Sequence, residues 1–346
     1  TKPPGSLGRL EALAIQLAGI TGRADAPVNA RAIVVAAADH GVAQRGVSAY
    51  PPEVTAQMVA NFCTGGAAIN VLARSVGASV IVVDVGVATP LPPACDGAPG
   101  LLRHPLGPGT ANLAEAPAMD RATCRAALDL GAQLAADLVH GRSPLGPDSA
   151  GDGVSGGRPH GGARALVTGE MGIGNTTAAA ALVAAFSGRS AAEVTGRGAG
   201  VDDAGLARKT AVVQRALTRR AGAAGPLETL AALGGFEIAA LAGFIVGGAA
   251  AGVPVLVDGL IADAALLAAD RLVPGVAARC IAGHRSVEPG AAAVLEELGL
   301  VPVLDLELRL GEGSGACLAL PIVEAAARIL AEMATFDAAG VTEKDR

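Results

Sequence analysis

Short apolar runs alternate with longer helical stretches along most of this 346-residue chain. The short runs are rich in alanine and β-branched residues and predict buried strands. They are Ala32–Ala37, Ser79–Val83, Ala165–Thr168, Pro254–Val257, Arg279–Ala282 and Pro302–Leu306. In the longer stretches apolar residues recur at three- and four-residue steps, which predicts amphipathic helices. These are Ser6–Leu17, Ala122–Val139, Thr176–Phe186, Asp203–Arg220 and Ala316–Met333. The alternation is typical of βαβ units around a parallel sheet, so the predicted fold class is α/β.

One uncharged stretch, Ile238–Val257, is long enough to be weighed as a membrane span. It is rich in alanine and glycine, and Gly252-Val253-Pro254 interrupts it. Acidic Glu237 and Asp258 flank it, without a basic anchor. A buried helix, a turn and a short strand explain it better, so we expect no integral membrane segment.

Composition and charge exclude several classes of partner. The chain has no Trp, one Tyr, five Phe and a net charge of −6, so it has little with which to bind a nucleic acid. No pair of cysteines or histidines has the spacing of a metal site, and we expect neither a metal nor a cofactor. The residues Thr1–Gly5 show no signal-peptide pattern. Together with five widely spaced cysteines, this predicts a cytoplasmic protein with reduced thiols (Cys63, Cys95, Cys124, Cys280, Cys317).

A glycine- and proline-rich segment, Gly141–Ala163, differs from its surroundings. Its apolar content is too low to offset the entropy of ordering it, which predicts a flexible surface loop. Whether it acts as a lid over a site is left open.

Polar side chains stand where the predicted strands end. They are Asp39-His40, Asp84, Glu170, Asp258 and His284, each beside or close to a glycine. Any one of them can be explained as a cap of the following helix. Because the carboxyl ends of parallel strands meet at one edge, where α/β proteins bind ligands, the group as a whole predicts a polar cleft.

The segment Gly169–Thr177 has the strongest local signal. It follows a predicted strand, opens a helix and has the glycine spacing of a P-loop, but Asn175 stands where a P-loop has lysine. The backbone N–H groups of such a turn can still bind phosphate. Glu170 would repel a phosphate, so we expect it to face another part of the substrate. A P-loop-like kinase or NTPase remains an alternative, weakened by the missing lysine.

A second glycine-rich turn, Gly196–Gly200, precedes a predicted helix that carries Lys209. The other two lysines, Lys2 and Lys344, sit near the chain ends, whereas arginine supplies most of the positive charge. Lys209 is therefore either a solvated surface residue or a contact to phosphate.

A third turn, Gly311–Gly315, leads into an apolar helix and carries Glu312 between two glycines. Glycine on both sides lets a ligand approach closely. A carboxylate in such a partly dry turn is suited to general base catalysis near neutral pH. The turn can also be a plain helix cap, and the chain can be a non-catalytic protein that binds a nucleotide or an azole base.

Long blocks in the same order resemble one family, the nicotinate-nucleotide–dimethylbenzimidazole phosphoribosyltransferases of cobalamin nucleotide-loop assembly. These blocks are TKPPGSLGRLE, ADHGVAQRGVSAYPPEVTAQMVANF, GGAAINVLAR, GEMGIGNTT, GRGAGVDD, LGGFEIAALAGF, PVLVDGLI, AGHRSVEPG, LRLGEGSGA and MATFDAAGV. The poorest fit is the segment Gly141–Ala163. The resemblance covers nearly the whole chain.

The resemblance implies transfer of the 5-phosphoribosyl group from nicotinate mononucleotide to 5,6-dimethylbenzimidazole. The products would be α-ribazole 5′-phosphate and nicotinate, with inversion at C1′. It implies Glu312 as the general base and Glu170 as an assisting carboxylate. The implied phosphoribosyl- and nicotinate-binding residues are Gly172, Ile173, Gly174, Asn175, Thr176, Gly198, Lys209, Asp258 and Ser286. The implied base-binding residues are Ser48, Tyr50, Gln57, Met58 and Leu310.

The resemblance also implies an architecture. It is a large α/β domain at residues 31–315 with a Rossmann-like parallel sheet, and a small helical domain built from residues 1–30 and 316–346. It further implies a homodimer.

Overall fold

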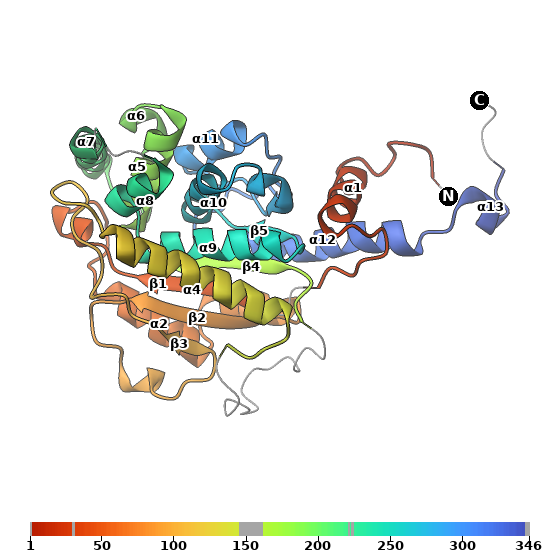
Figure 1. Ribbon diagram of the computed structural model, residues 1–346, viewed down its shortest axis with the longest axis horizontal. Helices are drawn as coiled ribbons and strands as arrows, with labels where there is room; N and C mark the ends of the chain where they lie inside the picture. The colour runs from red at the N-terminus through yellow and green to blue at the C-terminus, as the bar shows by residue number, and fades with distance from the viewer. Residues whose placement is uncertain (1, 30–31, 145–161, 221, 223–224, 343–346) are drawn as a thin grey trace.

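The computed structural model describes residues 2–29, 32–144, 162–220, 222 and 225–342. They contain a six-stranded sheet in the order β3-β2-β1-β4-β5-β6, in which every neighbouring pair is parallel (Figure 1). The strands are β1 (Ala32–Ala38), β2 (Ser79–Gly86), β3 (Leu101–Arg103), β4 (Leu166–Met171), β5 (Val255–Val257) and β6 (Cys280–Ala282). This order confirms a Rossmann-like sheet, and its strand order reverses between β1 and β4.

The sheet is covered on both faces, which explains why its strands read as continuous apolar runs. All seven residues of β1 are buried. Alternate residues of β1 enter two separate cores, Val34 with one layer of helices and Ile33 with the other.

The first layer of helices packs in the core that contains Val34. It consists of α4 (Arg121–Val139), α5 (Asn175–Ser187), α6 (Ala191–Val194), α7 (Asp203–Arg220), α8 (Pro226–Leu233), α9 (Phe236–Ala250), α10 (Leu260–Leu272) and α11 (Pro289–Glu297). The second layer packs in the core that contains Ile33. It consists of α1 (Arg9–Thr21), α2 (Val54–Thr64), α3 (Ala68–Ser75) and α12 (Ser314–Glu332), with the short α13 (Phe336–Ala339) beyond it (Figure 1).

Five of the six predicted strands are confirmed, and the sixth is wrong. The segment Pro302–Leu306 runs beside the end of β6 but forms only an isolated bridge, between His284 and Leu304. Pro302 has no N–H to donate to a ladder, and Glu307 has a φ of 56°, which turns the chain away. The three-residue strand β3 was not predicted, because so short a run has no periodicity.

The uncharged stretch Ile238–Val257 forms most of α9, a turn and β5, so the predicted buried helix, turn and strand is confirmed. Among the described residues one helix, α12, is long and apolar enough to cross a membrane. Half of it is buried within the molecule, as expected of a core helix.

The N- and C-terminal segments lie together, because α1 packs on α12 (Figure 1). α12 also contacts β4 and β5, so it belongs to the layer that covers the sheet. The division into a small domain (residues 1–30 and 316–346) and a large domain (31–315) stays a prediction. Most of the predicted flexible loop, Gly141–Ala163, lies outside the described residues.

Candidate active site

A cavity of about 370 Å³ lies at the carboxyl ends of β4, β5 and β6, a volume typical of small-molecule sites. Both glycine turns singled out in the sequence line it. The predicted residues on its wall are Tyr50, Met58, Glu170, Gly172, Ile173, Asn175, Thr176, Gly198, Ser286, Leu310 and Glu312.

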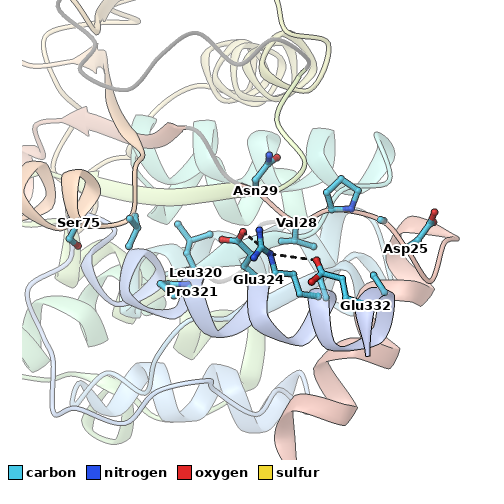
Figure 2. Close-up of a pocket in the computed structure, with 14 residues that line it drawn as sticks. Asp25, Val28, Asn29, Ser75, Leu320, Pro321, Glu324 and Glu332 are labelled. Atoms are coloured by element: carbon cyan, nitrogen blue, oxygen red, sulfur yellow. Dashed lines mark ion pairs between the residues drawn. The ribbon is translucent and has the colours of Figure 1, made fainter. Parts of the chain in front are cut away.

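A larger cavity, about 480 Å³, lies elsewhere, between the segment Asp25–Asn29 and α12 (Figure 2). Its prominent polar feature is Arg328, which pairs with Glu324 at 3.5 Å and Glu332 at 4.0 Å along the helix. None of the predicted site residues lines it. The chemistry therefore belongs to the smaller cavity.

The two glycine turns pack directly against each other. Gly169 lies against the carbonyl of Glu312, and Gly311 lies against the carboxylate of Glu170. A side chain at either glycine would collide with these groups. The absence of Cβ atoms therefore brings the two carboxylates, which are far apart in the sequence, to one wall of the cavity.

Glu312 is held in a left-handed conformation that non-glycine residues rarely adopt, with a φ of 63°. Its side chain is mostly buried, and its Oε2 accepts a hydrogen bond of 3.2 Å from the backbone N–H of Ile69, in the first turn of α3. Burial raises the pKa of Glu312, and the hydrogen bond from Ile69 opposes this. Such a carboxylate is a stronger base than one in water.

Glu170 lies deeper, at the end of β4. Burial raises its pKa to about 8, and the charges of Asp258 and Glu237 add to this. The side-chain amide of Asn175 donates a hydrogen bond to Glu170 and opposes the rise. Asn175, at the P-loop lysine position, thus binds the carboxylate of its own turn. Near neutral pH Glu170 is mostly protonated and uncharged.

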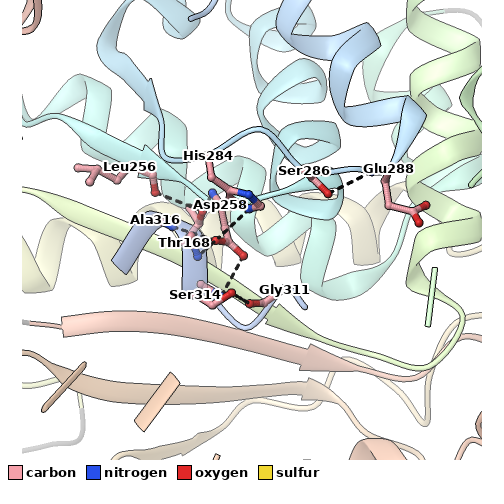
Figure 3. Close-up of polar contacts among 11 residues, drawn as sticks. Thr168, Leu256, Asp258, His284, Ser286, Glu288, Gly311, Ser314 and Ala316 are labelled. Carbon is pink, nitrogen blue, oxygen red and sulfur yellow. Dashed lines mark hydrogen bonds and ion pairs between the residues drawn. The ribbon is translucent and has the colours of Figure 1, made fainter. Parts of the chain in front are cut away.

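Asp258 lies beneath the cavity wall and organises the second turn (Figure 3). Its Oδ2 accepts a hydrogen bond from Gly313 N–H at 3.1 Å. Its Oδ1 accepts two more, from Gly315 at 2.7 Å and Ala316 at 3.0 Å, and lies 3.6 Å from His284 Nε2. Burial raises the pKa of Asp258, whereas His284 and the three N–H groups lower it. Asp258 therefore caps the N-terminus of α12 and is not on the cavity wall.

The predicted phosphate side is built around the start of α5. Lys209 is fully buried on α7, and its Nζ donates hydrogen bonds to Thr176 Oγ1 at 2.8 Å and to the carbonyl of Gly196 at 3.0 Å. Burial lowers the pKa of Lys209 to about 8, and the nearby Glu288 opposes this. Lys209 is therefore not a solvated surface residue. It lies behind the cavity wall, and the wall residue Thr176 separates its ammonium group from the cavity.

Only some of the predicted base-binding residues line the cavity. Tyr50, Met58 and Leu310 line the cavity, and Tyr50 and Leu310 remain more than half exposed (54% and 55%). Ser48 and Gln57 do not line it: the Ser48 hydroxyl accepts from Tyr50 N–H, and Gln57 is exposed on α2. Gly174 is also absent from the wall, because it packs against Ala43 and His40.

Comparisons with known proteins show the family to which the chain belongs. A phosphoribosyltransferase family model matches residues 1–145 and 150–341. A nicotinate-nucleotide–dimethylbenzimidazole phosphoribosyltransferase from Chloroflexus aurantiacus is 55% identical over 345 residues, covering 99% of this chain and 92% of the relative. The chain is a member of this phosphoribosyltransferase family.

Further relatives agree. A phosphoribosyltransferase of the same name from Ralstonia nicotianae is 50% identical, covering 99% of this chain and 91% of the relative. The crystal structure of CobT from Thermus thermophilus is 48% identical and superposes with a TM-score of 0.88, covering 99% of this chain and 96% of that one. The family and the fold implied by the sequence resemblance are confirmed, and the kinase alternative has no support.

In this family member the cavity has wall residues that were not predicted as substrate contacts. Glu288 lies on the wall and accepts a hydrogen bond of 2.8 Å from Gly198 N–H, and Arg309 donates one of 3.2 Å to the carbonyl of Gly198. The only sequence signals were their positions within the AGHRSVEPG and LRLGEGSGA blocks. The apolar wall residues Val54, Leu260 and Ile261 likewise had no signal beyond their positions within the ADHGVAQRGVSAYPPEVTAQMVANF and PVLVDGLI blocks.

The prediction of a polar cleft from strand ends is right for three positions. Glu170 and His284 line the cavity and Asp258 lies directly behind its wall. Asp39 and Asp84 serve the backbone: Asp39 accepts from Ala88 N–H, and Asp84 accepts from the two residues that follow Val85. For those two, the helix-cap alternative does not hold either, because they bind N–H groups at the end of β2 and in the loop after it, not the start of a helix.

Proposed function

We propose that this chain transfers the 5-phosphoribosyl group of nicotinate mononucleotide to 5,6-dimethylbenzimidazole, releasing nicotinate and α-ribazole 5′-phosphate with inversion at C1′. One observation carries the proposal. Two buried carboxylates, Glu312 and Glu170, face one cavity whose other wall is a glycine turn backed by a buried lysine, Lys209. Such a site combines a base with a place for a phosphate.

Glu312 acts as the general base in this proposal. One benzimidazole nitrogen attacks C1′ as the bond from C1′ to the pyridine nitrogen breaks, and the bonding electron pair returns to that nitrogen. The pyridine nitrogen is quaternary in the substrate, so nicotinate leaves without being protonated first. The other benzimidazole N–H becomes acidic as charge develops, and Glu312 accepts its proton. Its raised pKa makes it a suitable acceptor.

Glu170 assists in the uncharged form. A charged Glu170 would repel the phosphate of nicotinate mononucleotide, but a pKa of about 8 keeps it mostly protonated near pH 7. The protonated carboxyl can donate a hydrogen bond to the substrate, and Asn175 holds it in place.

The remaining wall residues take the binding roles. We propose that Gly172, Ile173, Asn175 and Thr176, with Gly198 and Ser286, bind the phosphoribosyl and nicotinate groups. Lys209 supplies positive charge through Thr176, and Gly174 and Asp258 shape the two turns. Tyr50, Met58 and Leu310 form the apolar pocket for the aromatic base, with Ser48 and Gln57 behind them.

Product chromatography tests the proposed function. Purified protein is mixed with nicotinate mononucleotide and 5,6-dimethylbenzimidazole, and we expect equimolar nicotinate and α-ribazole 5′-phosphate. A reaction without 5,6-dimethylbenzimidazole is the control, because it measures how much nicotinate is released by hydrolysis of nicotinate mononucleotide. Tight calorimetric binding of both substrates without any nicotinate release would instead establish the non-catalytic binding protein.

We also propose that the protein is a homodimer that works in the cytoplasm. All five cysteines are free thiols, and four are buried, which suits a reducing compartment. The dimer rests on the family resemblance and on exposed apolar side chains of α1 and the end of α12, such as Ile15 and Leu330.

A further inference from the structure

A buried hydrogen-bonded pair of side chains, which does not line the cavity, lies behind the first glycine turn. His40 Nε2 and Glu237 Oε1 are 2.6 Å apart, and both side chains are fully buried. His40 follows β1, and Glu237 belongs to the first turn of α9. The pair therefore joins two elements at the point where the strand order of the sheet reverses.

The imidazole of His40 fills the space under the turn Gly172–Asn175. A Cβ on Gly172 would lie 3.5 Å from His40 Cδ2, and a Cβ on Gly174 would lie 3.3 Å from His40 Cβ. On the other side Gly235 lies against both the His40 ring and the Glu237 carboxylate. His40 therefore packs between this turn and the start of α9.

Each member of the pair depends on the other. Within the described residues His40 Nδ1 and Glu237 Oε2 have no hydrogen-bond partner. The contact between Nε2 and Oε1 is thus the one side-chain hydrogen bond that each residue makes among the described residues. Buried polar atoms without a partner are uncommon in folded proteins, so their presence here calls for an explanation.

The pair also acts on Glu170 electrostatically. The groups that influence the Glu170 carboxyl are Asp258 after β5, Glu237 on α9, Asn175 on α5 and Glu312 on the facing turn. Of these, Glu237 neither lines the cavity nor contacts either turn through a hydrogen bond. Its charge nevertheless helps to keep the proton on Glu170.

We propose that His40 and Glu237 are positioning residues, which support the phosphate-binding turn Gly172–Asn175 from beneath. The inference rests on the proposed function of the site. Neither residue touches substrate in this proposal; both act through the turn and through Glu170.

The variant Glu237→Gln tests the electrostatic part, because glutamine keeps the shape and an acceptor for His40 but removes the charge. We expect kcat to fall about 10- to 100-fold, the loss expected when a catalytic group is slightly misplaced. Loss of the negative charge lowers the pKa of Glu170, so the alkaline limb of the kcat–pH profile moves to lower pH. The KM for 5,6-dimethylbenzimidazole stays unchanged, because its pocket lies on the other wall. A kcat–pH profile that superposes on that of the wild type would overturn this part.

A double-mutant cycle tests the positional part. His40→Ala and Glu237→Ala each raise the KM for nicotinate mononucleotide, and the double variant is no worse than the poorer single variant. Additive losses would mean that the two residues do not act as a pair.

A measurement on the wild-type protein covers the case in which these variants do not fold. The ring signals of the five histidines are followed by NMR as nicotinate mononucleotide is added. The signals of the other four histidines are assigned with His104→Gln, His140→Gln, His160→Gln and His284→Gln, leaving that of His40. We expect the His40 signal to shift with ligand, and an unchanged signal at saturation overturns the proposal. Nicotinate release by the wild type is scored separately, so failure of the pair and failure of the proposed function give different results.

Discussion

At the scale of single residues, Glu312 is the side chain on which the proposed chemistry depends most. Replacing it by glutamine keeps the acceptor for Ile69 N–H but removes the base. We expect kcat to fall about 10²- to 10⁴-fold with little change in KM. Nicotinate release at saturating substrates measures this.

Glu307 offers a matched control for that experiment. It is also a non-glycine residue with a positive φ, 56°, but its side chain is exposed. Glu307→Gln should keep wild-type kcat. If Glu312→Gln retained near-normal turnover as well, the proton would have another acceptor.

The raised pKa of Glu170 leads us to expect that the stability of the protein depends on pH. Its pKa is raised from 4.5 to about 8, so its contribution to stability is fully present below 4.5 and is lost as pH rises through 8. Glu170→Gln cannot ionise and does not suffer this loss. We expect its free energy of unfolding, relative to wild type, to rise by roughly 2–3 kcal/mol between pH 6 and pH 9.

Urea unfolding of both proteins at the two pH values measures this change. A difference that does not vary with pH would mean that Glu170 titrates in its ordinary range. The variant Asp129→Asn, at a surface position on α4, serves as the control.

The lowered pKa of Lys209 leads us to expect that substrate binding depends on pH. Its pKa is lowered to about 8, so it loses its charge as pH rises through that value. We expect the KM for nicotinate mononucleotide to rise above pH 8, whereas an ordinary lysine would keep it constant to about pH 10. Steady-state kinetics between pH 6.5 and 9.5 measures this.

Arginine stays charged throughout that pH range, which supplies the comparison. A folded Lys209→Arg variant should show a KM that no longer rises with pH. A wild-type KM that is constant up to pH 9.5 would show that the charge of Lys209 does not contribute to binding.

At the scale of elements, patterns within short segments predicted the strands and the turns, whereas contacts between distant segments could not be predicted. β1 and β5 were predictable because both faces of each strand are buried, so their sequences are continuously apolar. The glycine turns were predictable because each is a contiguous motif. The contact of Gly198 with Glu288 joins residues 90 positions apart, and no local pattern encodes such a contact.

The contact between the two glycine turns gives a prediction at this scale. A Cβ on Gly169 would lie 2.7 Å from the carbonyl carbon of Glu312 and 3.0 Å from the backbone nitrogen of Gly313. Backbone atoms cannot rotate away, so the turns must separate. We expect Gly169→Ala to lose about 1–3 kcal/mol of stability and about 100-fold in kcat.

Gly19→Ala is the control for that substitution. Gly19 is on α1 and a Cβ there meets nothing within 4 Å. This variant should keep full activity and gain up to about 1 kcal/mol, because alanine favours a helix. Equal activity of the two variants would show that the contact between the turns does not position Glu312.

At the scale of the whole molecule, α1, the end of α12 and α13 project beyond the sheet (Figure 1). This projection carries several exposed apolar side chains, namely Ile15, Leu330, Met333 and Val341. Ile15 is 72% exposed, an unusual value for an isoleucine on a helix that otherwise packs on the body. Exposed apolar groups gathered on one part of a surface are typical of an interface between proteins.

We therefore expect the chain to sediment as a dimer of twice its 33.7 kDa mass, with the projection at the interface. A charge at the centre of an apolar interface loses its hydration without gaining a partner, so Ile15→Glu should shift the protein towards monomer. Val273→Glu, at an exposed apolar position on the opposite layer of helices, is the matched control and should leave the mass unchanged. Analytical ultracentrifugation over a range of concentrations measures both. A wild-type monomer at every concentration would remove the dimer, and a dimer that survives Ile15→Glu would place the interface on another surface.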